Sequence, residues 1–270
     1  MRATELASGL DHPEGVCWDP DAGVLYAGGE LGQLYRVSLD GVVEEVARLP
    51  AFALGLAVDG RGRVVVCCRD AGVWSWDGDM AQIAGGFAFA NYPAFGPDGT
   101  LYVSDSGAWG ANDGCIRANG EVLSRVAPHF TNGLAVSPDG VWLWVAESFV
   151  PRVGRVDLAG GRYEEIVRLD GTVPDGLALG ADGAVLVSCY RPDRIYRLDP
   201  AGELTVVAED PQGTLIAAPT NVCFAGEELD RIVCANLGRW HLTVIDETGL
   251  RGAPLHRPAS WPATTAKETR

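Results

Sequence analysis

The chain has 270 residues, of which 36 are acidic and 21 basic, so its formal net charge is 21 − 36 = −15. A composition of 47% hydrophobic and 21% charged residues is that of a globular protein and excludes a largely disordered chain. The acidic balance disfavours nucleic-acid and anionic-membrane partners, because phosphate contacts need clustered Lys and Arg. The sequence shows no apolar run of about 18 residues and no signal-type N-terminus, so we expect a cytoplasmic protein.

Short β-rich runs alternate with turn signals along the whole chain. Such runs, split by Asp-Gly turns, are typical of β-hairpins, and no long stretch shows a helical period. The sequence therefore predicts an all-β protein. In chain order the turn signals are 19–23, 59–62, 97–99, 138–140 and 181–183, and the runs after them begin VLYAGG, RVVVCC, TLYVSD, VWLWVAE and AVLVSC. The seven cysteines form no Cys-x-x-Cys pair and several lie in apolar runs, so we expect reduced core residues.

The runs group into units that repeat. A four-stranded unit recurring every ~40 residues is the signature of a β-propeller blade. The sequence predicts a six-bladed β-propeller with four antiparallel strands per blade, forming one domain over 1–270; a two-sheet sandwich would not require a fixed period. The residues that open the units are Glu14, Leu54, Asn91, Asn132, Asp175 and Asn221, with Thr220 aligning equally well in the last unit.

The ends of the chain have separate predicted roles. The segment 4–10 precedes Glu14 much as 45–49 precedes Leu54. Because a ring of blades must close to protect its edges, we expect the N-terminal strand to complete the last blade. The tail 258–270 has no alternating pattern, and we expect it to lie on the surface.

The opening residues should meet near the axis, because the first strand of each propeller blade runs along the central channel. Carboxylates and amides converging there would repel one another or lie unsatisfied unless a cation bound them. Oxygen ligands without His or Cys suit Ca²⁺ first, with Mg²⁺, Mn²⁺ or Zn²⁺ as alternatives. A competing interpretation is that Asn and Asp before Gly are turn residues. It does not explain why Glu14 precedes Gly15 at the equivalent place.

Four segments carry a family resemblance. They are 12–26 (HPEGVCWDPDAGVLY), 131–148 (TNGLAVSPDGVWLWVAES), 173–183 (VPDGLALGADG) and 219–233 (PTNVCFAGEELDRIV). Together they resemble the gluconolactonase/regucalcin (senescence marker protein) family across nearly all six units. The resemblance implies a six-bladed propeller with one divalent metal in the channel, held by Glu14, Asn132 and Asp175. It makes Asp175 the catalytic residue and Asn91 a substrate contact, or a metal ligand as in related phosphotriesterases.

The chain departs from that family at two places. Regucalcin-type enzymes have an Arg two residues before the Asn91 position, where this chain has Phe89, and an acidic residue near the position of Trp109. An apolar rim of Phe89 and Trp109 would favour a substrate less polar than a sugar lactone.

Further candidates lie at the ends of the second runs and before the opening residues. We expect substrate contacts from Asp105, Glu147 and Tyr190, although each could instead be a surface hairpin residue. His12 and His129 could border the pocket and move protons, or bond only to loop backbone.

The first functional hypothesis is a metal-dependent hydrolase of a lactone or related ester, with Asp175 as base or nucleophile and a small-molecule substrate. Alternatives are a propeller phosphotriesterase, a metal-free strictosidine-synthase-like enzyme, and a non-catalytic binding propeller. The absence of a Gly-x-Ser-x-Gly elbow disfavours a serine hydrolase. The oligomeric state is left open.

Overall fold

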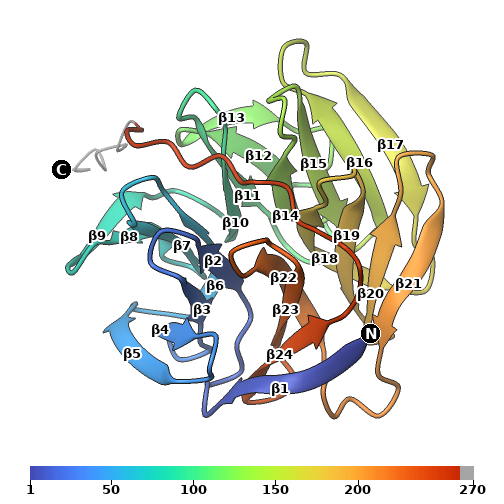
Figure 1. The fold of residues 1–270 in the computed structure, drawn as a ribbon. Coiled ribbons are helices and arrows are strands. Elements are labelled where there is room, and N and C mark those ends of the chain that lie inside the picture. Colours follow the sequence, from blue (N-terminus) through green and yellow to red (C-terminus); the bar gives the residue numbers. More distant parts are fainter. Residues whose placement is uncertain (262–270) are drawn as a thin grey trace.

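A computed structural model describes residues 1–261 as a ring of six four-stranded sheets (Figure 1). The first strands are β1 (Arg2–Ser8), β2 (Val16–Asp19), β3 (Val24–Gly28), β4 (Gln33–Ser38), β5 (Val43–Arg48), β6 (Ala53–Val58), β7 (Val64–Cys68) and β8 (Gly72–Trp76). Then come β9 (Met80–Ala84), β10 (Ala90–Phe95), β11 (Leu101–Asp105), β12 (Cys115–Ala118), β13 (Glu121–Ser124), β14 (Thr131–Val136), β15 (Trp142–Glu147) and β16 (Arg152–Asp157). The last are β17 (Tyr163–Arg168), β18 (Val173–Leu179), β19 (Val185–Tyr190), β20 (Arg194–Leu198), β21 (Leu204–Glu209), β22 (Pro219–Ala225), β23 (Arg231–Asn236) and β24 (His241–Asp246).

The predicted six-bladed propeller is confirmed. Five sheets are formed by consecutive strands in antiparallel order, from β2–β5 to β18–β21. The sixth has the order β1-β24-β23-β22, so the N-terminal strand closes the ring as predicted (Figure 1). Among the described residues, no helix is long and apolar enough to cross a membrane.

The Asp-Gly turns form for the predicted reason. In the β10–β11 turn, Asp98 accepts a hydrogen bond from the Thr100 N–H at 3.0 Å, while Gly99 takes the left-handed conformation with φ +87°. Asp139 and Gly140 repeat this arrangement one blade later. An Asp that bonds the backbone two residues on and a Gly with positive φ make a tight turn between paired strands.

The hydrophobic core is divided into six clusters, each lying between neighbouring blades. Leu34 and Tyr26 of the first blade, for example, pack against Leu56 and Val64 of the second. Every cysteine is buried and unpaired, as predicted, and several belong to these clusters. Because burial of apolar area is the dominant favourable term in folding, stability here depends on each blade having two neighbours.

The segment after β24 makes contacts that the sequence did not predict; of the tail predicted over 258–270, only residues 258–261 are described. Residues 252–261, the C-terminal strap, cross the face of the ring (Figure 1). Ala253 N–H donates to the Leu179 carbonyl at 2.8 Å, and the His256 Nε2 atom lies 2.8 Å from the Ser137 carbonyl oxygen. Trp261 is buried, packs on Phe95 and donates to Asp59 at 2.9 Å. Residues 262–270 lie outside the described residues.

Replacing Trp261 by Ala should lower the free energy of unfolding by about 3 kcal/mol, because a large buried side chain and its hydrogen bond are lost. The control is Trp240→Ala, where the side chain is 54% exposed and the loss should stay below about 1 kcal/mol. Urea denaturation of both variants measures the difference. Equal losses would show that the strap does not contribute to folding.

Candidate functional site

The opening residues lie at irregularities in the innermost strands. The ladder between β14 and β15 skips Asn132 and Gly133, and the ladder between β18 and β19 skips Asp175 and Gly176. Two residues are skipped in the same way where β6 pairs with β7 and where β10 pairs with β11. A β-bulge re-aims the side chain that it carries, so in five of the six blades one side chain leaves the ladder here. In the first blade, Glu14 lies two residues before β2 begins.

The glycine after the opening residue allows the inner strands of neighbouring blades to approach closely, and it does not form a turn. A Cβ atom on Gly133 would collide with the carbonyl oxygen of Asp175 in the next blade, and one on Gly15 with that of Leu54. Gly176 packs in the same way on Thr220. None of these glycines has a positive φ, so the turn interpretation is wrong. The glycines instead let neighbouring inner strands touch.

The last blade resolves the ambiguity in the alignment. The register shift between β22 and β23 falls at Thr220, which is therefore the opening residue of this blade. Its hydroxyl donates to the Glu14 carbonyl at 2.7 Å and so joins the last blade to the first. Asn221 takes the place of the glycines, and its Oδ1 accepts a hydrogen bond from the Tyr92 hydroxyl at 3.4 Å.

Two serines fix the orientation of the two asparagines. The Asn91 amide nitrogen donates to Ser106 Oγ at 2.9 Å, and the Asn132 amide nitrogen donates to Ser148 Oγ at 3.0 Å. Each serine in turn donates to a carbonyl of the next blade, Ser148 to Pro174 at 2.7 Å. Because the amide nitrogens are engaged, the amide oxygens are the groups left for another partner.

Those oxygens find no hydrogen-bond partner among residues 1–261. Glu14, Asn91, Asn132 and Asp175, here called the axial oxygen site, are all buried, with exposures of 6% or less. The unpartnered atoms are the Oε2 atom of Glu14 and the Oδ1 atoms of both asparagines. Burying a polar atom without a partner is costly, so such a cluster indicates a ligand-binding site.

The two carboxyl groups act on each other. Burial raises the pKa of Glu14 to about 8. Burial, followed by the charge of Glu14, raises the pKa of Asp175 well above its usual range, while the Asn132 amide opposes this rise. Within residues 1–261, no basic side chain contributes to either shift, so the two neighbouring carboxyls have no positive counter-charge from this part of the chain. The residues fit a hard divalent cation, which would supply the charge and accept the free oxygens.

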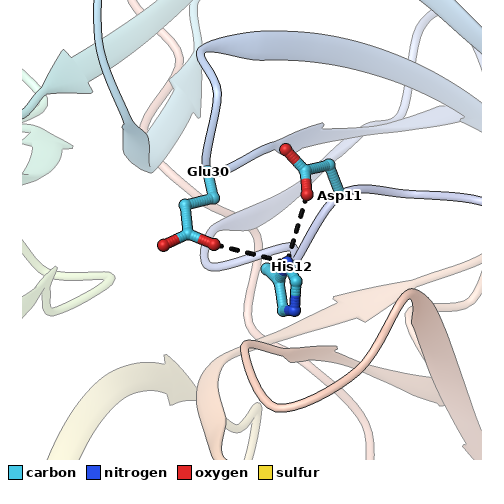
Figure 2. Close-up of side chains that lie close together, drawn as sticks. All are labelled: Asp11, His12 and Glu30. Atoms are coloured by element: carbon cyan, nitrogen blue, oxygen red, sulfur yellow. Dashed lines mark hydrogen bonds and ion pairs between the residues drawn. The ribbon is translucent and has the colours of Figure 1, made fainter.

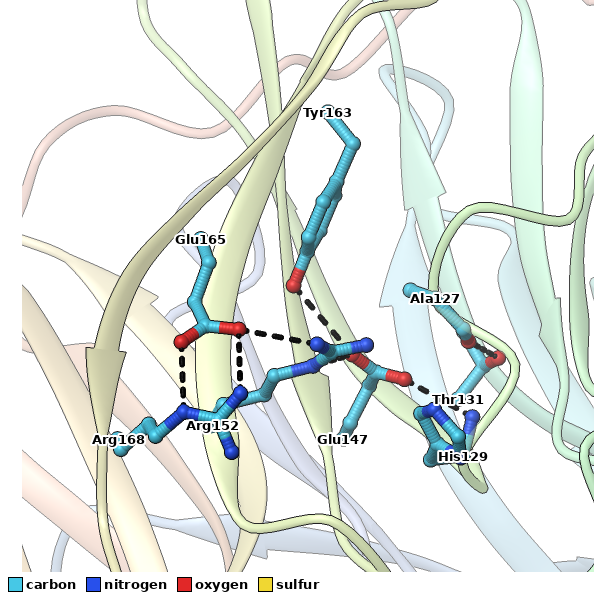
Figure 3. A network of polar contacts seen from close by, with 8 residues as sticks. All are labelled: Ala127, His129, Thr131, Glu147, Arg152, Tyr163, Glu165 and Arg168. Atoms are coloured by element: carbon cyan, nitrogen blue, oxygen red, sulfur yellow. Dashed lines mark hydrogen bonds and ion pairs between the residues drawn. The ribbon is translucent and has the colours of Figure 1, made fainter.

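Asp105 and Glu147, predicted as substrate contacts, are instead tied into the protein. Glu147 accepts hydrogen bonds from the His129 N–H at 2.8 Å and from the Tyr163 hydroxyl at 3.3 Å, and pairs with Arg152 (Figure 3). Asp105 accepts from the Phe89 N–H at 2.8 Å and pairs with Arg117 at 2.8 Å. Both carboxylates are buried with every oxygen engaged, and we no longer expect them to bind substrate. They hold the loops that lead into β10 and β14.

A carboxylate–imidazole cluster beside the first blade was not predicted from the sequence. His12 Nδ1 lies 3.1 Å from Asp11 Oδ1 and 3.3 Å from Glu30 Oε2 (Figure 2). One ligand atom from each residue falls within 4.8 Å of the others. Asp11 Oδ2, however, already accepts from Leu31 N–H and the Gln33 side chain, both at 3.1 Å. These polar groups satisfy one another, unlike those of the axial oxygen site.

Two further predicted substrate contacts are Tyr190 and His129. Burial, then the charges of Asp175 and Glu14, raise the pKa of Tyr190, which places its hydroxyl in the field of both carboxyls and keeps it protonated. His129 stands in the loop before β14, and its Nδ1 atom is buried without a partner. Both stay predicted substrate contacts.

Phe89 and Trp109 belong to one aromatic cluster that the sequence revealed only in part. Phe130 lies between them, with ring centroids 5.5 Å from Phe89 and 4.9 Å from Trp109, and Phe149 packs 5.7 Å from Trp109. Phe89 and Phe130 each stand two residues before an asparagine of the axial oxygen site, and their carbonyls accept the N–H groups of the orienting serines. Trp109 is 53% exposed. Phe130 was missed, although its position repeats that of Phe89.

This geometry defines a six-bladed propeller with a cluster of buried carboxyl and amide oxygens. Residues 12–236 match the family described as the SMP-30/Gluconolactonase/LRE-like region, and the chain belongs to that family.

Solved structures of similar fold include three from this group. A putative gluconolactonase has 21% identity, with 94% of each chain covered and a TM-score of 0.78. Regucalcin from Agrobacterium tumefaciens, described as a calcium-binding protein, has 20% identity, 95% and 97% coverage and a TM-score of 0.79. A gluconolactonase from Xanthomonas campestris has 20% identity, 93% and 90% coverage and a TM-score of 0.76.

A curated relative is similar to this chain over part of its length. The Arabidopsis thaliana protein named strictosidine synthase-like 6 is 25% identical over 210 residues, which are 64% of this chain and 55% of the relative. The match thus spans about half the length of that relative.

The free energy of unfolding should depend on pH through Glu14. With a chelator present, the folded protein holds the Glu14 proton more tightly than the unfolded chain does, because the pKa is raised from 4.5 to about 8. The resulting contribution to the free energy of unfolding is complete below pH 4.5 and is lost as the pH rises through about 8. Glu14→Gln should flatten that fall, whereas Glu44→Gln, at an exposed ion pair, should not. Urea denaturation between pH 5 and 9 measures the slope. An unchanged slope in Glu14→Gln would contradict the assignment.

Proposed function

We propose that the protein is a divalent-metal-dependent hydrolase of a lactone or related ester. The observation that supports it is the set of buried, unpartnered oxygens of Glu14, Asn91 and Asn132 beside Asp175. Two carboxylates and two amide oxygens are ligands that Ca²⁺ prefers, with Mg²⁺, Mn²⁺ and Zn²⁺ as alternatives. The regucalcin of similar fold is described as calcium-binding, which supports Ca²⁺ as the first ion to test.

Each residue of the axial oxygen site then has a role. When bound, the cation would polarise the substrate carbonyl and stabilise negative charge on its oxygen. Asp175, kept ionised by the cation, accepts the proton of an attacking water or attacks the carbonyl itself. The Tyr190 hydroxyl stays protonated and can donate to the leaving oxygen. Asn91 and Asn132 present fixed amide oxygens because their nitrogens are held by serines.

The aromatic cluster supports a substrate with an apolar part. Phe89, Trp109, Phe130 and Phe149 lie on the loops next to Asn91 and Asn132, and Phe149 is 42% exposed. Exposed apolar patches of this kind mark binding surfaces. Aryl and alkyl lactones are therefore the first substrates to assay, with gluconolactone as the polar comparison.

The relative named strictosidine synthase-like 6 favours a second candidate, a condensing enzyme that needs no metal. Under that alternative the axial oxygen site would bind no ion tightly. Phosphotriesters belong in the same assay panel, since related propellers cleave them. Turnover of no ester, lactone or phosphotriester with metal present would instead favour a non-catalytic binding propeller.

Replacing Asp175 by Ala should reduce turnover of the best lactone by about 1,000-fold or more, because general-base catalysis is lost. Asp170→Asn, at an exposed turn, is the matched control and should keep full activity. Steady-state kinetics with added Ca²⁺, Mn²⁺ and Zn²⁺, together with melting temperatures, measure this. Normal hydrolysis by a folded Asp175→Ala protein would refute the mechanism.

Ser148→Ala should weaken divalent-cation binding by about tenfold, because the Asn132 amide loses the partner that orients it. Calorimetric titration with Ca²⁺ measures affinity without turnover. Ser38→Ala, in a turn of the first blade, should leave the affinity unchanged. Unaltered binding in Ser148→Ala would mean that the serine does not position the ligand.

A further inference from the structure

The channel contains a cavity of about 420 Å³ that is separate from the axial oxygen site. Its walls are formed by the parts of the six inner strands that follow the opening residues, and Glu14, Asn91, Asn132 and Asp175 are not among them. The Tyr92 side chain lines the cavity, and its hydrogen bond to Asn221 crosses between blades at that level. The volume falls within the range of small-molecule sites.

The cavity exists because a small residue recurs at the same position of every inner strand. The third residue after each opening position is small in every blade, whereas the residues on either side of it are larger. Each small residue is also more exposed than the residue before it, which places it at the cavity wall. The ring consists of Cys17, Ala57, Ala94, Ala135, Ala178 and Cys223.

The C-terminal strap contributes residues 253–257 to the lining of this cavity. Arg257 pairs through its Nη2 atom with Asp19 at 3.0 Å and Asp21 at 2.9 Å. Among the described residues that line the cavity, Arg257 is the one Arg or Lys side chain. It is therefore the strongest hydrogen-bond donor that this lining offers to a ligand.

The charges around Arg257 define which acceptor fits. Asp19 and Asp21 already neutralise the guanidinium, and exposed Glu227 is a further acidic residue at the cavity. A carboxylate ligand would therefore meet net repulsion, whereas a carbonyl oxygen would not. The remaining walls are apolar, since Leu and Val side chains surround the small residues.

We propose that this cavity is a second ligand site, for a compact, uncharged and largely apolar molecule with one carbonyl oxygen that accepts from the Arg257 guanidinium. The strap closes over the bound molecule. The site lies apart from the axial oxygen site, so this proposal does not depend on the hydrolase activity.

The test uses three molecules of one shape: camphor, which has a carbonyl; bornane, which lacks it; and camphor-10-sulfonate, which is anionic. None is a lactone or an ester. Displacement of the neutral fluorophore N-phenyl-1-naphthylamine from the full-length protein reports their binding. Camphor should bind about tenfold more tightly than bornane, as expected for a hydrogen bond to a charged donor, and the sulfonate should not bind.

Variants locate the site. Ala57→Leu should weaken camphor binding by about tenfold or more, because the larger side chain would occupy the part of the cavity that the ligand needs. Ala159→Leu, at an exposed turn, and Trp109→Ala, in the aromatic cluster, should bind camphor as the unaltered chain does. Ala178→Leu replaces Ala57→Leu if the latter fails to fold, as judged by its melting temperature.

Three results would overturn the proposal. The first is no displacement of the fluorophore by camphor. The second is a camphor affinity in Ala57→Leu and Ala178→Leu that equals that of the unaltered chain. The third is loss of camphor binding in Trp109→Ala, which would move the site to the aromatic cluster. Loss of lactone hydrolysis is not a readout here, so failure of the hydrolase proposal is recognised separately.

Discussion

The innermost strands of this ring approach one another closely at one end of the channel, and the rest of the site depends on that approach. Glycines 15, 133 and 176 pack against the backbone of the next blade where no Cβ could fit. In five of the six blades, a bulge turns one side chain out of its ladder. Residues far apart in the sequence thus meet, and two of them are carboxyls. Close packing and converging charge are consequences of the same Gly-containing motif.

Bringing two carboxyl groups and two amide oxygens together in a buried place is unfavourable for a protein without a ligand. The pKa values of Glu14 and Asp175 rise because each carboxyl is buried and, for Asp175, because the other is near. Three buried oxygens accept no hydrogen bond. A fold that retains such an arrangement has a use for it, since an apolar layer would pack without cost. Elsewhere the protein pairs its buried carboxylates with arginines, as at Glu147 and Asp105.

Much of this could be predicted from the sequence, because it follows from repetition. The period of the Asp-Gly turns predicted six blades, and alignment of the opening residues placed Glu14, Asn132 and Asp175 at equivalent positions. The orientation of each amide could not be predicted, because it depends on Ser106 and Ser148 bonding across a bulge. The engagement of Glu147 depends on Arg152 and Tyr163, whose side chains meet it only through strand pairing. The strap was missed because contacts with all six blades, and not a strand pattern, hold it in place.

The most direct measurement is the content of divalent ions, by elemental analysis, in protein purified without chelator. The account predicts about one ion per chain, with Ca²⁺ the first expectation, and essentially none when Glu14 and Asp175 are both replaced by their amides. An ion-free chain that also fails to bind added Ca²⁺, Mg²⁺, Mn²⁺ or Zn²⁺ would contradict it. So would a content that the double replacement leaves unchanged.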